Sequence, residues 1–158
     1  MTPSQRVQAL LDAMDLGIHV VEFGASTATA PEAAEAAGCE LGAIVKSLLF
    51  MIDERPTLVL VAGDRKADLK QLAARFGVGK KKVKLADAET VLRVTGYEVG
   101  GVPPVGHRVA VRTLIDRTLG RFDLVWAAAG NANAVFPIAY DRLVAVTGGR
   151  VMDLVEGE

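Results

Sequence analysis

The sequence contains few of the residues that build metal centres and disulfides. Its single cysteine, Cys39, cannot close an intramolecular disulfide, and its two histidines, His19 and His107, lie far apart in the chain. No spacing typical of metal ligands can be assembled from so few thiol and imidazole groups. Cys39 has no histidine beside it to act as a base, and no two carboxylates stand out as an acid and base pair. We therefore expect no metal and no cofactor, and we interpret Cys39 as a packing residue.

Long apolar runs are missing as well. Hydrophobic residues make up 51% of the 158 residues, but no run approaches the roughly 20 apolar residues that a transmembrane helix needs. The first residues, MTPSQRVQALLDAMD, predict an amphipathic helix and lack the pattern of a leader peptide. We expect a single domain over residues 1–158, no membrane segment and a cytoplasmic location.

The chain has no excess of either charge. Its 18 Lys and Arg against 19 Asp and Glu give a net charge of −1, which argues against a strongly basic nucleic-acid-binding protein. Basic residues nevertheless cluster between positions 64 and 84, where GKKKVK does not match a phosphate-binding loop. This cluster is either a solvated face or a contact for a nucleic-acid backbone. The candidate contact residues are Arg65, Lys66, Lys80, Lys81 and Lys82.

Hydrophobic periodicity predicts short helices and closely paired strands. We expect helices near residues 3–14, 29–38, 64–76 and 87–94. Strands are expected near residues 18–23, 43–52, 55–63, 109–115, 124–128 and 134–138, followed by a short helix or turn and a final strand. There is no internal repeat and no low-complexity linker. The pattern predicts a mixed α/β or α+β fold with a twisted sheet and small helices around it, and argues against a regular βαβ alternation.

Lys46 is the one charged residue in the stretch AIVKSLLFMI, residues 43–52. In a strand, its side chain shares one face with Ile44 and Leu48, while Ser47 points to the other face, and both faces look buried. One interpretation is that Lys46 lies near the strand end and reaches water along its own aliphatic stem. The alternative is a cation held at the rim of a pocket, where it meets an anionic or carbonyl-bearing ligand.

The segment GGVPPVGH, Gly100 to His107, predicts a stiff loop. Pro103 and Pro104 fix their own backbone and remove two donors, while the glycines permit unusual conformations. The N–H groups of Gly101 and Val102 are then free to bind a carbonyl or an oxyanion. A purely structural turn is the alternative interpretation.

A third segment, AAAGNANAVFPI, covers residues 127–138. Ala128 and Gly130 leave an open floor where another molecule can approach the backbone, and Asn131 is a natural turn residue. A simple hairpin is the alternative.

These segments, in this order, resemble the YbaK family of aminoacyl-tRNA deacylases, which are related to the editing domain of bacterial prolyl-tRNA synthetases. The motifs that carry the resemblance are IVKSLLF, GDRKADLKQLA, GGVPPVG and FDLVWAAAG. The resemblance covers nearly the whole chain. It implies a twisted, mixed and partly barrel-like sheet flanked by short helices, and hydrolysis of the ester that joins a wrong amino acid to tRNA.

The resemblance also assigns roles to residues. Lys46 would bind the terminal adenosine or polarise the ester, and the loop around Gly101 would hold the aminoacyl group, so that both count as catalytic. A hydroxyl of the terminal ribose would help to activate water. Ala128 stands where relatives often have serine, which leaves the amino acid that is removed open among Ala, Cys, Ser and Pro. The expected substrate-binding residues are Ser47, Gly100, Val102, Pro103, Pro104, His107, Ala128, Gly130 and Asn131.

The expected partners are mischarged tRNA and an aminoacyl-tRNA synthetase. Two other functions stay open at this point. The first is a non-catalytic module that binds tRNA or a synthetase with the same fold, an alternative that Ala128 favours. The second is a hydrolase for other small esters, which would not depend on tRNA.

Overall fold

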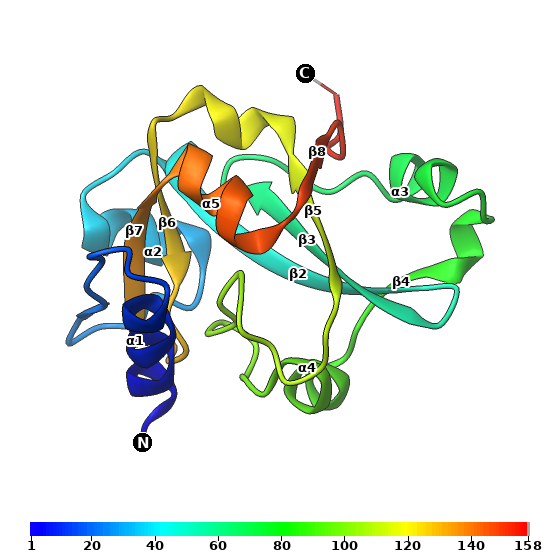
Figure 1. The fold of residues 1–158 in the computed structure, drawn as a ribbon. Helices are drawn as coiled ribbons and strands as arrows, with labels where there is room; N and C mark the ends of the chain where they lie inside the picture. The colour runs from blue at the N-terminus through cyan, green and yellow to red at the C-terminus, as the bar shows by residue number, and fades with distance from the viewer. Residues whose placement is uncertain (158) are drawn as a thin grey trace.

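The protein is built around one mixed β-sheet, seen in a computed structural model that describes residues 1–157 (Figure 1). Within these residues the sheet has eight strands in the order β1-β7-β6-β2-β3-β5-β8, and β4 pairs with β2 beside this path. The strands are β1 (Val21–Glu22), β2 (Ile44–Ile52), β3 (Arg55–Ala62), β4 (Val83–Leu85), β5 (Arg112–Asp116), β6 (Leu124–Ala128), β7 (Ala134–Ala139) and β8 (Arg150–Met152). The helices are α1 (Pro3–Ala13), α2 (Ala30–Ala37), α3 (Leu69–Arg75), α4 (Ala88–Thr95) and α5 (Tyr140–Thr147), with 3-10 turns η1 (Leu41–Ala43), η2 (Lys80–Lys82) and η3 (Arg117–Arg121).

The β2–β3 hairpin forms the centre of the sheet. Its two strands pair antiparallel from Val45 opposite Ala62 to Ile52 opposite Arg55, as the sequence predicted. Parallel pairing of β3 with β5, β5 with β8 and β2 with β6 makes the sheet mixed. The predicted fold class is therefore confirmed.

Both faces of this sheet are covered by helices, which explains why the strands are almost continuously apolar. Val7 and Leu11 of α1 pack on one face with Leu58 and Leu60 of β3, together with apolar residues of α4 and α5. On the other face, Leu72 of α3 packs against the remaining β3 positions, and α2 covers the start of β2. Each fully buried leucine contributes about 1.5–3 kcal/mol relative to exposure.

Capping residues fix where the small helices begin. Thr2 and Gln5 form a capping box at α1, and Thr29 and Glu32 form another at α2. Asp87 accepts a hydrogen bond from the backbone of α4 at its first turn. The predicted helices near residues 3–14, 29–38 and 87–94 are confirmed.

Three predicted elements need correction. The helix expected over residues 64–76 begins at Leu69, because Asp68 is its N-cap and the residues before it extend along the C-terminal segment. The strand expected over residues 18–23 shrinks to Val21–Glu22 at the sheet edge, where it has one partner, β7. The strand expected from residue 109 starts at Arg112, because the Val109 N–H instead bonds to the end of α4.

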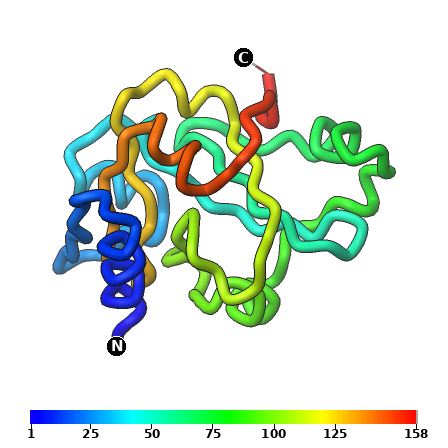
Figure 2. The backbone as a smooth tube through the Cα atoms, in the orientation of Figure 1, coloured from blue at the N-terminus to red at the C-terminus, as the bar shows by residue number. Residues whose placement is uncertain are grey.

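The chain between α4 and β5 forms a long irregular loop, light green in Figure 2, which folds back toward β6 and β7. The sequence predicted this shaped loop from its glycines and prolines. No helix within residues 1–157 combines the length and apolar character needed to cross a membrane.

Candidate active site

A cavity of about 350 Å³ lies where several parts of the chain meet at the start of β2. Lys46, Ser47, Gly100, Val102 and Ala128 all line it. The further lining residues are Thr27, Ala28, Thr29, Ala30, Pro31, Ala33, Ile44, Val45, Leu48, Gly63, Val99 and Val135. The lysine strand, the glycine and proline loop and the alanine segment, which are far apart in sequence, therefore meet at one cavity.

Lys46 is half-buried at this cavity. Its face of β2 is covered by α2 near the strand start and by α3 near the strand end, and Lys46 lies between the two covered parts. The Lys46 ammonium donates a hydrogen bond to the backbone carbonyl of Arg65 at 2.5 Å. Burial lowers the pKa of Lys46, and the nearby carboxylate of Asp64 partly opposes this effect. The geometry favours a cation at a pocket rim over one that extends freely into water.

The turn that receives the Lys46 ammonium is fixed by an ion pair. Asp64 accepts two hydrogen bonds from the Arg121 guanidinium, at 2.7 and 3.1 Å. This pairing lowers the pKa of the Asp64 carboxyl. The Arg121 guanidinium in turn lies 5.1 Å from the centre of the Phe122 ring. The Asp64 carboxylate therefore lies close to Lys46, but its charge is already paired with that of Arg121.

The glycine and proline loop presents Gly100 and Val102 to the cavity, and Gly101 faces away from it. The expectation that the Gly101 N–H is free is wrong, because it donates to the carbonyl of Glu98 at 3.0 Å. The Val102 N–H has no hydrogen-bond partner within residues 1–157. Of the two donors that the sequence suggested, Val102 is therefore the one that can meet a ligand.

Gly101 has a structural reason to be glycine. Its carbonyl accepts a hydrogen bond from the Gly130 N–H at 2.8 Å, which clips the loop to the β6–β7 connection. A Cβ atom at position 101 would lie 2.4 Å from the Gly130 carbonyl oxygen. Position 101 therefore tolerates no side chain without a shift of the backbone.

Pro103, Pro104 and His107 lie behind the cavity wall and do not line it. The carbonyl of Pro103 is 2.7 Å from Nε2 of His107, and since a carbonyl can only accept, Nε2 carries the proton. Burial lowers the pKa of His107, against the opposing effect of this hydrogen bond. These residues stiffen the loop and are not placed to touch a ligand in the cavity.

The segment of residues 127–138 contributes to two separate hollows. Ala128 lines the cavity, whereas Gly130 and Asn131 line a separate hollow beside α1 and Tyr97. Asn131 donates from its side-chain amide to the Ser4 hydroxyl at 3.1 Å. The expected grouping of Gly130 and Asn131 with the cavity residues is therefore not seen.

One wall of the cavity, formed by Thr27 to Pro31 at the start of α2, was not predicted from the sequence. The Thr29 capping box was visible in the sequence as a helix start. Nothing in the sequence placed that helix start beside Lys46, because the contact depends on how β2 and β7 pack against α2.

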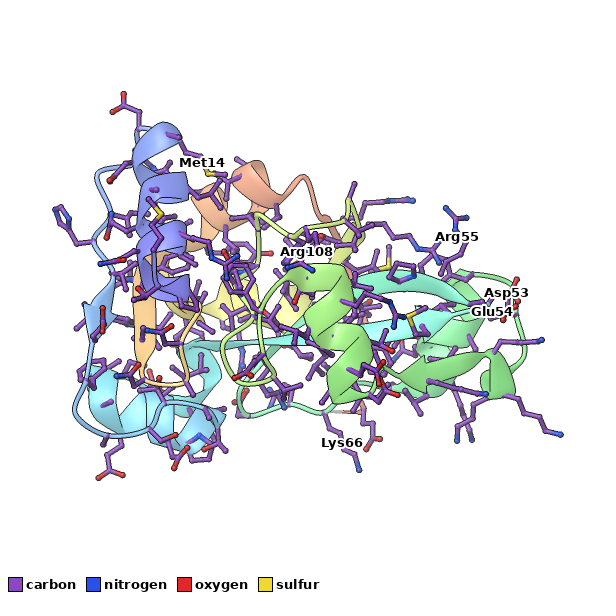
Figure 3. All side chains as sticks on the ribbon, turned by 90° about the horizontal axis from the view of Figure 1, so that it is seen from below. Met14, Asp53, Glu54, Arg55, Lys66 and Arg108 are labelled. Atoms are coloured by element: carbon purple, nitrogen blue, oxygen red, sulfur yellow. The ribbon has the colours of Figure 1, made fainter. Side chains whose placement is uncertain are left out.

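The basic residues form two groups. Arg65 and Lys66 follow β3 near Lys46, and Figure 3 shows the Lys66 side chain pointing outward from the molecule. Lys80, Lys81 and Lys82 form η2, beside the turn that contains the exposed Asp53. The two groups lie at opposite ends of β2, about 20 Å apart at 3.3 Å per residue. The cluster at residues 64–84 is thus continuous in the sequence and divided in space.

The Cys39 thiol is partly buried beside α2, and burial raises its pKa. Within the described residues 1–157, no three His, Cys, Asp or Glu side chains are grouped so that they could hold a metal ion.

The mixed sheet and the cavity beside Lys46 define an α/β protein with a hollow at the start of its central strand. A family model described as the aminoacyl-tRNA editing domain matches residues 25–146. The chain therefore belongs to the aminoacyl-tRNA editing domain family, as the resemblance of its motifs predicted.

The similar proteins agree with this assignment. YwhH of Bacillus subtilis, an uncharacterized protein, is 37% identical over 78% of this chain and 78% of its own length. EbsC of Enterococcus faecalis, a proposed Cys-tRNA(Pro)/Cys-tRNA(Cys) deacylase, is 26% identical over 82% of this chain and 79% of its own. A solved structure of a proposed trans-editing enzyme for prolyl-tRNA synthetase superposes with a TM-score of 0.92 and 40% identity, covering 99% of both chains. The proline–tRNA ligase of Maridesulfovibrio salexigens is 36% identical over 65% of this chain and 17% of its own length.

Proposed function

We propose that the protein is a trans-editing deacylase, which hydrolyses the ester bond between tRNA and a wrongly attached small amino acid. The observation that carries the proposal is the shared cavity of Lys46, Gly100 and Val102. The names of EbsC and of the superposed solved structure support the same reaction and a relation to prolyl-tRNA.

The chemistry needs little from the protein, because an aminoacyl ester is already activated. Orientation of the carbonyl, a positioned water and stabilisation of the developing oxyanion are sufficient help. Lys46 supplies the positive charge, and the unpaired Val102 N–H supplies a neutral donor at the same cavity. A hydroxyl of the terminal ribose helps to activate the water in this proposal. On cleavage, the C–O ester bond breaks, water adds to the acyl carbon, and the ribose oxygen leaves with a proton.

The size of the cavity favours a small amino acid. Its walls carry short side chains at Ala28, Ala30 and Ala128, and about 350 Å³ must hold both the aminoacyl group and part of the ribose. We propose alanine, serine or cysteine as the residue removed. Hydrophobic contacts change the binding free energy of such similar side chains by only about 1–3 kcal/mol, so the three amino acids compete for the same site.

The backbone of tRNA supplies the remaining contact in this proposal. Arg65 and Lys66 lie next to Lys46 along the chain that leaves β3, where they can meet phosphates near the 3′ end. The exposed lysines of η2 lie about 20 Å further along β2, within reach of the acceptor stem. A synthetase partner, if one is needed to keep the substrate close, would be a prolyl-tRNA synthetase.

The direct test is a panel of mischarged tRNAs. Purified protein is incubated with Ala-, Ser- and Cys-tRNA(Pro) and with the correct Pro-tRNA(Pro), and the remaining aminoacyl-tRNA is measured over time. We expect at least one small mischarged substrate to be hydrolysed faster than Pro-tRNA(Pro). Salt-sensitive binding of tRNA without any hydrolysis would replace the proposal with a binding module. Hydrolysis of free aminoacyl esters as fast as that of mischarged tRNA would indicate a general esterase instead.

A further inference from the structure

Strand β2 has a gap in its pairing at the cavity. On the side away from β3, it pairs with β6 at Ile44 and Val45, and with β4 from Phe50 to Ile52. The stretch between these two partners contains Lys46, Ser47 and Leu48, all of which are more exposed than the residues that flank them. The central strand of the sheet is thus an open edge over a few residues, and the cavity lies against this edge.

The register shows which backbone groups face the gap. The Gly63 N–H donates to the Ile44 carbonyl at 2.8 Å, so Ile44 directs its hydrogen-bonding groups toward β3. Because these groups alternate along an antiparallel strand, Lys46 and Leu48 also direct theirs toward β3. Val45 and Ser47 direct theirs to the opposite side.

Other bonds confirm this alternation at both ends of the gap. The Ala86 N–H donates to the Leu49 carbonyl at 2.9 Å, on the side of β4. Val45 is paired with Ala127 of β6 on the same side. Ser47 lies between these two paired positions, and within residues 1–157 neither its N–H nor its C=O has a partner there.

The Ser47 side chain adds a third polar group without a partner. Its hydroxyl oxygen is inaccessible to solvent and makes no hydrogen bond within the described residues. A buried polar group of this kind costs free energy unless a ligand or water satisfies it. Ser47 therefore presents a backbone donor and a backbone acceptor to the gap beside Lys46, while its unpartnered hydroxyl lies buried behind the cavity surface.

We propose that the Ser47 backbone recognises the free α-ammonium group of the aminoacyl ester, an inference that rests on the proposed function. The Ser47 carbonyl accepts a hydrogen bond from the ammonium, and the Ser47 N–H donates to the ester carbonyl oxygen of the same aminoacyl group. A strand edge offers this acceptor and donor at the spacing of an amino acid's own amine and carbonyl. The site is therefore selective for a free amino terminus, and it excludes peptidyl- and formylaminoacyl-tRNA.

The selectivity has a physical basis in charge. A hydrogen bond from an ammonium to a carbonyl is roughly twice as strong as one between neutral groups. Acylation removes this charge and adds bulk where β6 and β4 enclose the gap. Replacement of the amine by a hydroxyl keeps the size and removes only the charge.

The test uses stable amide analogues of the substrate with the full chain. Alanyl, lactyl and N-acetylalanyl groups are each attached to 3′-amino-3′-deoxyadenosine, and binding is followed by NMR through the amide of Ser47. We expect the alanyl compound to bind at least about 10-fold more tightly than either of the others. We also expect it to shift the Ser47 amide more than the amides of Lys46 and Leu48, which point toward β3.

Two variants separate the backbone from the hydroxyl. Ser47→Ala removes the hydroxyl alone and should keep the preference for the alanyl compound. Ser47→Pro removes the N–H that faces the gap, a change that an open strand edge tolerates, and should weaken binding of the alanyl compound at least about 10-fold. Because the comparison of the three ligands uses the unmodified protein, it holds even if Ser47→Pro does not fold.

Several outcomes would overturn the inference. These are equal binding of the three analogues, binding without a shift of the Ser47 amide, and no binding at all. The proposed function is judged separately, by hydrolysis of mischarged tRNA. Hydrolysis of N-acetylalanyl-tRNA as fast as alanyl-tRNA would refute amine recognition and leave the deacylase proposal intact. Selective binding of the alanyl compound without any hydrolysis of mischarged tRNA would support amine recognition and refute the deacylase proposal.

Discussion

His107 stabilises the glycine and proline loop in its neutral form, with Nε2 donating to the Pro103 carbonyl. Because its pKa is lowered in the folded state by burial, the unfolded chain binds a proton more readily as the pH falls. The free energy of unfolding should therefore decrease as the pH falls from about 6.5, the ordinary pKa of histidine, through the lower pKa of the folded state. Urea denaturation at a series of pH values between 7.5 and 5 measures this loss.

The two histidines provide a matched control for this prediction. His19 is exposed, and His19→Gln should leave the pH dependence unchanged. His107→Gln should flatten it in the same pH range. If both variants keep the pH dependence of the wild type, another group is responsible for it.

Lys46 is the clearest case of a residue whose proposed role conflicts with stability. Burial disfavours its charged form, as the lowered pKa shows. Lys46→Met keeps most of the aliphatic stem and removes the charge, at the cost of the bond to the Arg65 carbonyl. We expect the free energy of unfolding to change by less than about 1 kcal/mol, as measured by urea denaturation at pH 7. A loss of several kcal/mol would mean that Lys46 serves the fold.

At the scale of elements, the loop that follows α4 lies close to the β6–β7 connection, where Gly101 meets Gly130. Gly101→Ala forces this approach apart, because the new Cβ would lie 2.4 Å from a backbone oxygen. We expect it to lower the free energy of unfolding by about 1–3 kcal/mol and to slow deacylation, since Gly100 and Val102 move with the loop. Thermal unfolding and the tRNA assay measure the two effects.

Gly24→Ala is the control for the loop variant. A Cβ at position 24 meets nothing within 4 Å. This variant should change stability by no more than about 0.5 kcal/mol. A Gly101→Ala protein that is as stable and active as the Gly24→Ala protein would show that the loop does not need its glycine.

Local signals in the sequence predicted most of the helices and strands. They failed where contacts with a distant segment determine where an element begins. Helix α2 was predictable because Thr29, Pro31 and Glu32 specify a helix start within a few residues. Helix α3 was predicted too long, because its true start depends on the C-terminal segment that holds residues 67 and 68. The prediction of a free Gly101 N–H was wrong for a different, local reason, since this N–H donates to the carbonyl of Glu98 in a turn of the same loop.

At the scale of the whole molecule, the sheet separates the two basic groups that look continuous in the sequence. If tRNA spans both ends of β2, Lys80, Lys81 and Lys82 contact phosphates far from the cavity. Replacing all three by Ala should raise KM for mischarged tRNA, leave kcat unchanged, and make the dependence of binding on salt less steep. Steady-state kinetics at several salt concentrations measures this effect.

The control for that prediction removes positive charge elsewhere. Arg142→Ala with Arg150→Ala changes exposed residues of α5 and β8. KM and the salt dependence should then stay close to those of the wild type. Equal effects of the two sets would show that net charge matters and that the η2 lysines make no specific contact.

The sequence predicted that Lys46, the glycine and proline loop and Ala128 belong to one site, although through a family pattern and not through spacing. The sequence could not predict the gap in the pairing of β2. The gap arises because β6 pairs with β2 only at Ile44 and Val45, whereas β4 pairs with it only from Phe50 to Ile52. The family resemblance placed Ser47 among the substrate-binding residues, but no local signal in the sequence indicated that its backbone is unpaired. Its unpaired backbone is a property of the assembled sheet.

The most direct test of the account is single-turnover deacylation by the Lys46→Met protein, with the mischarged tRNA that the wild type hydrolyses best. The account predicts a rate at least about 100-fold lower than that of the wild type, as expected for loss of a group that stabilises a developing oxyanion. The circular dichroism spectrum should stay unchanged. A rate within about threefold of the wild type, from a folded variant, would contradict the claim that the Lys46 ammonium acts at this cavity.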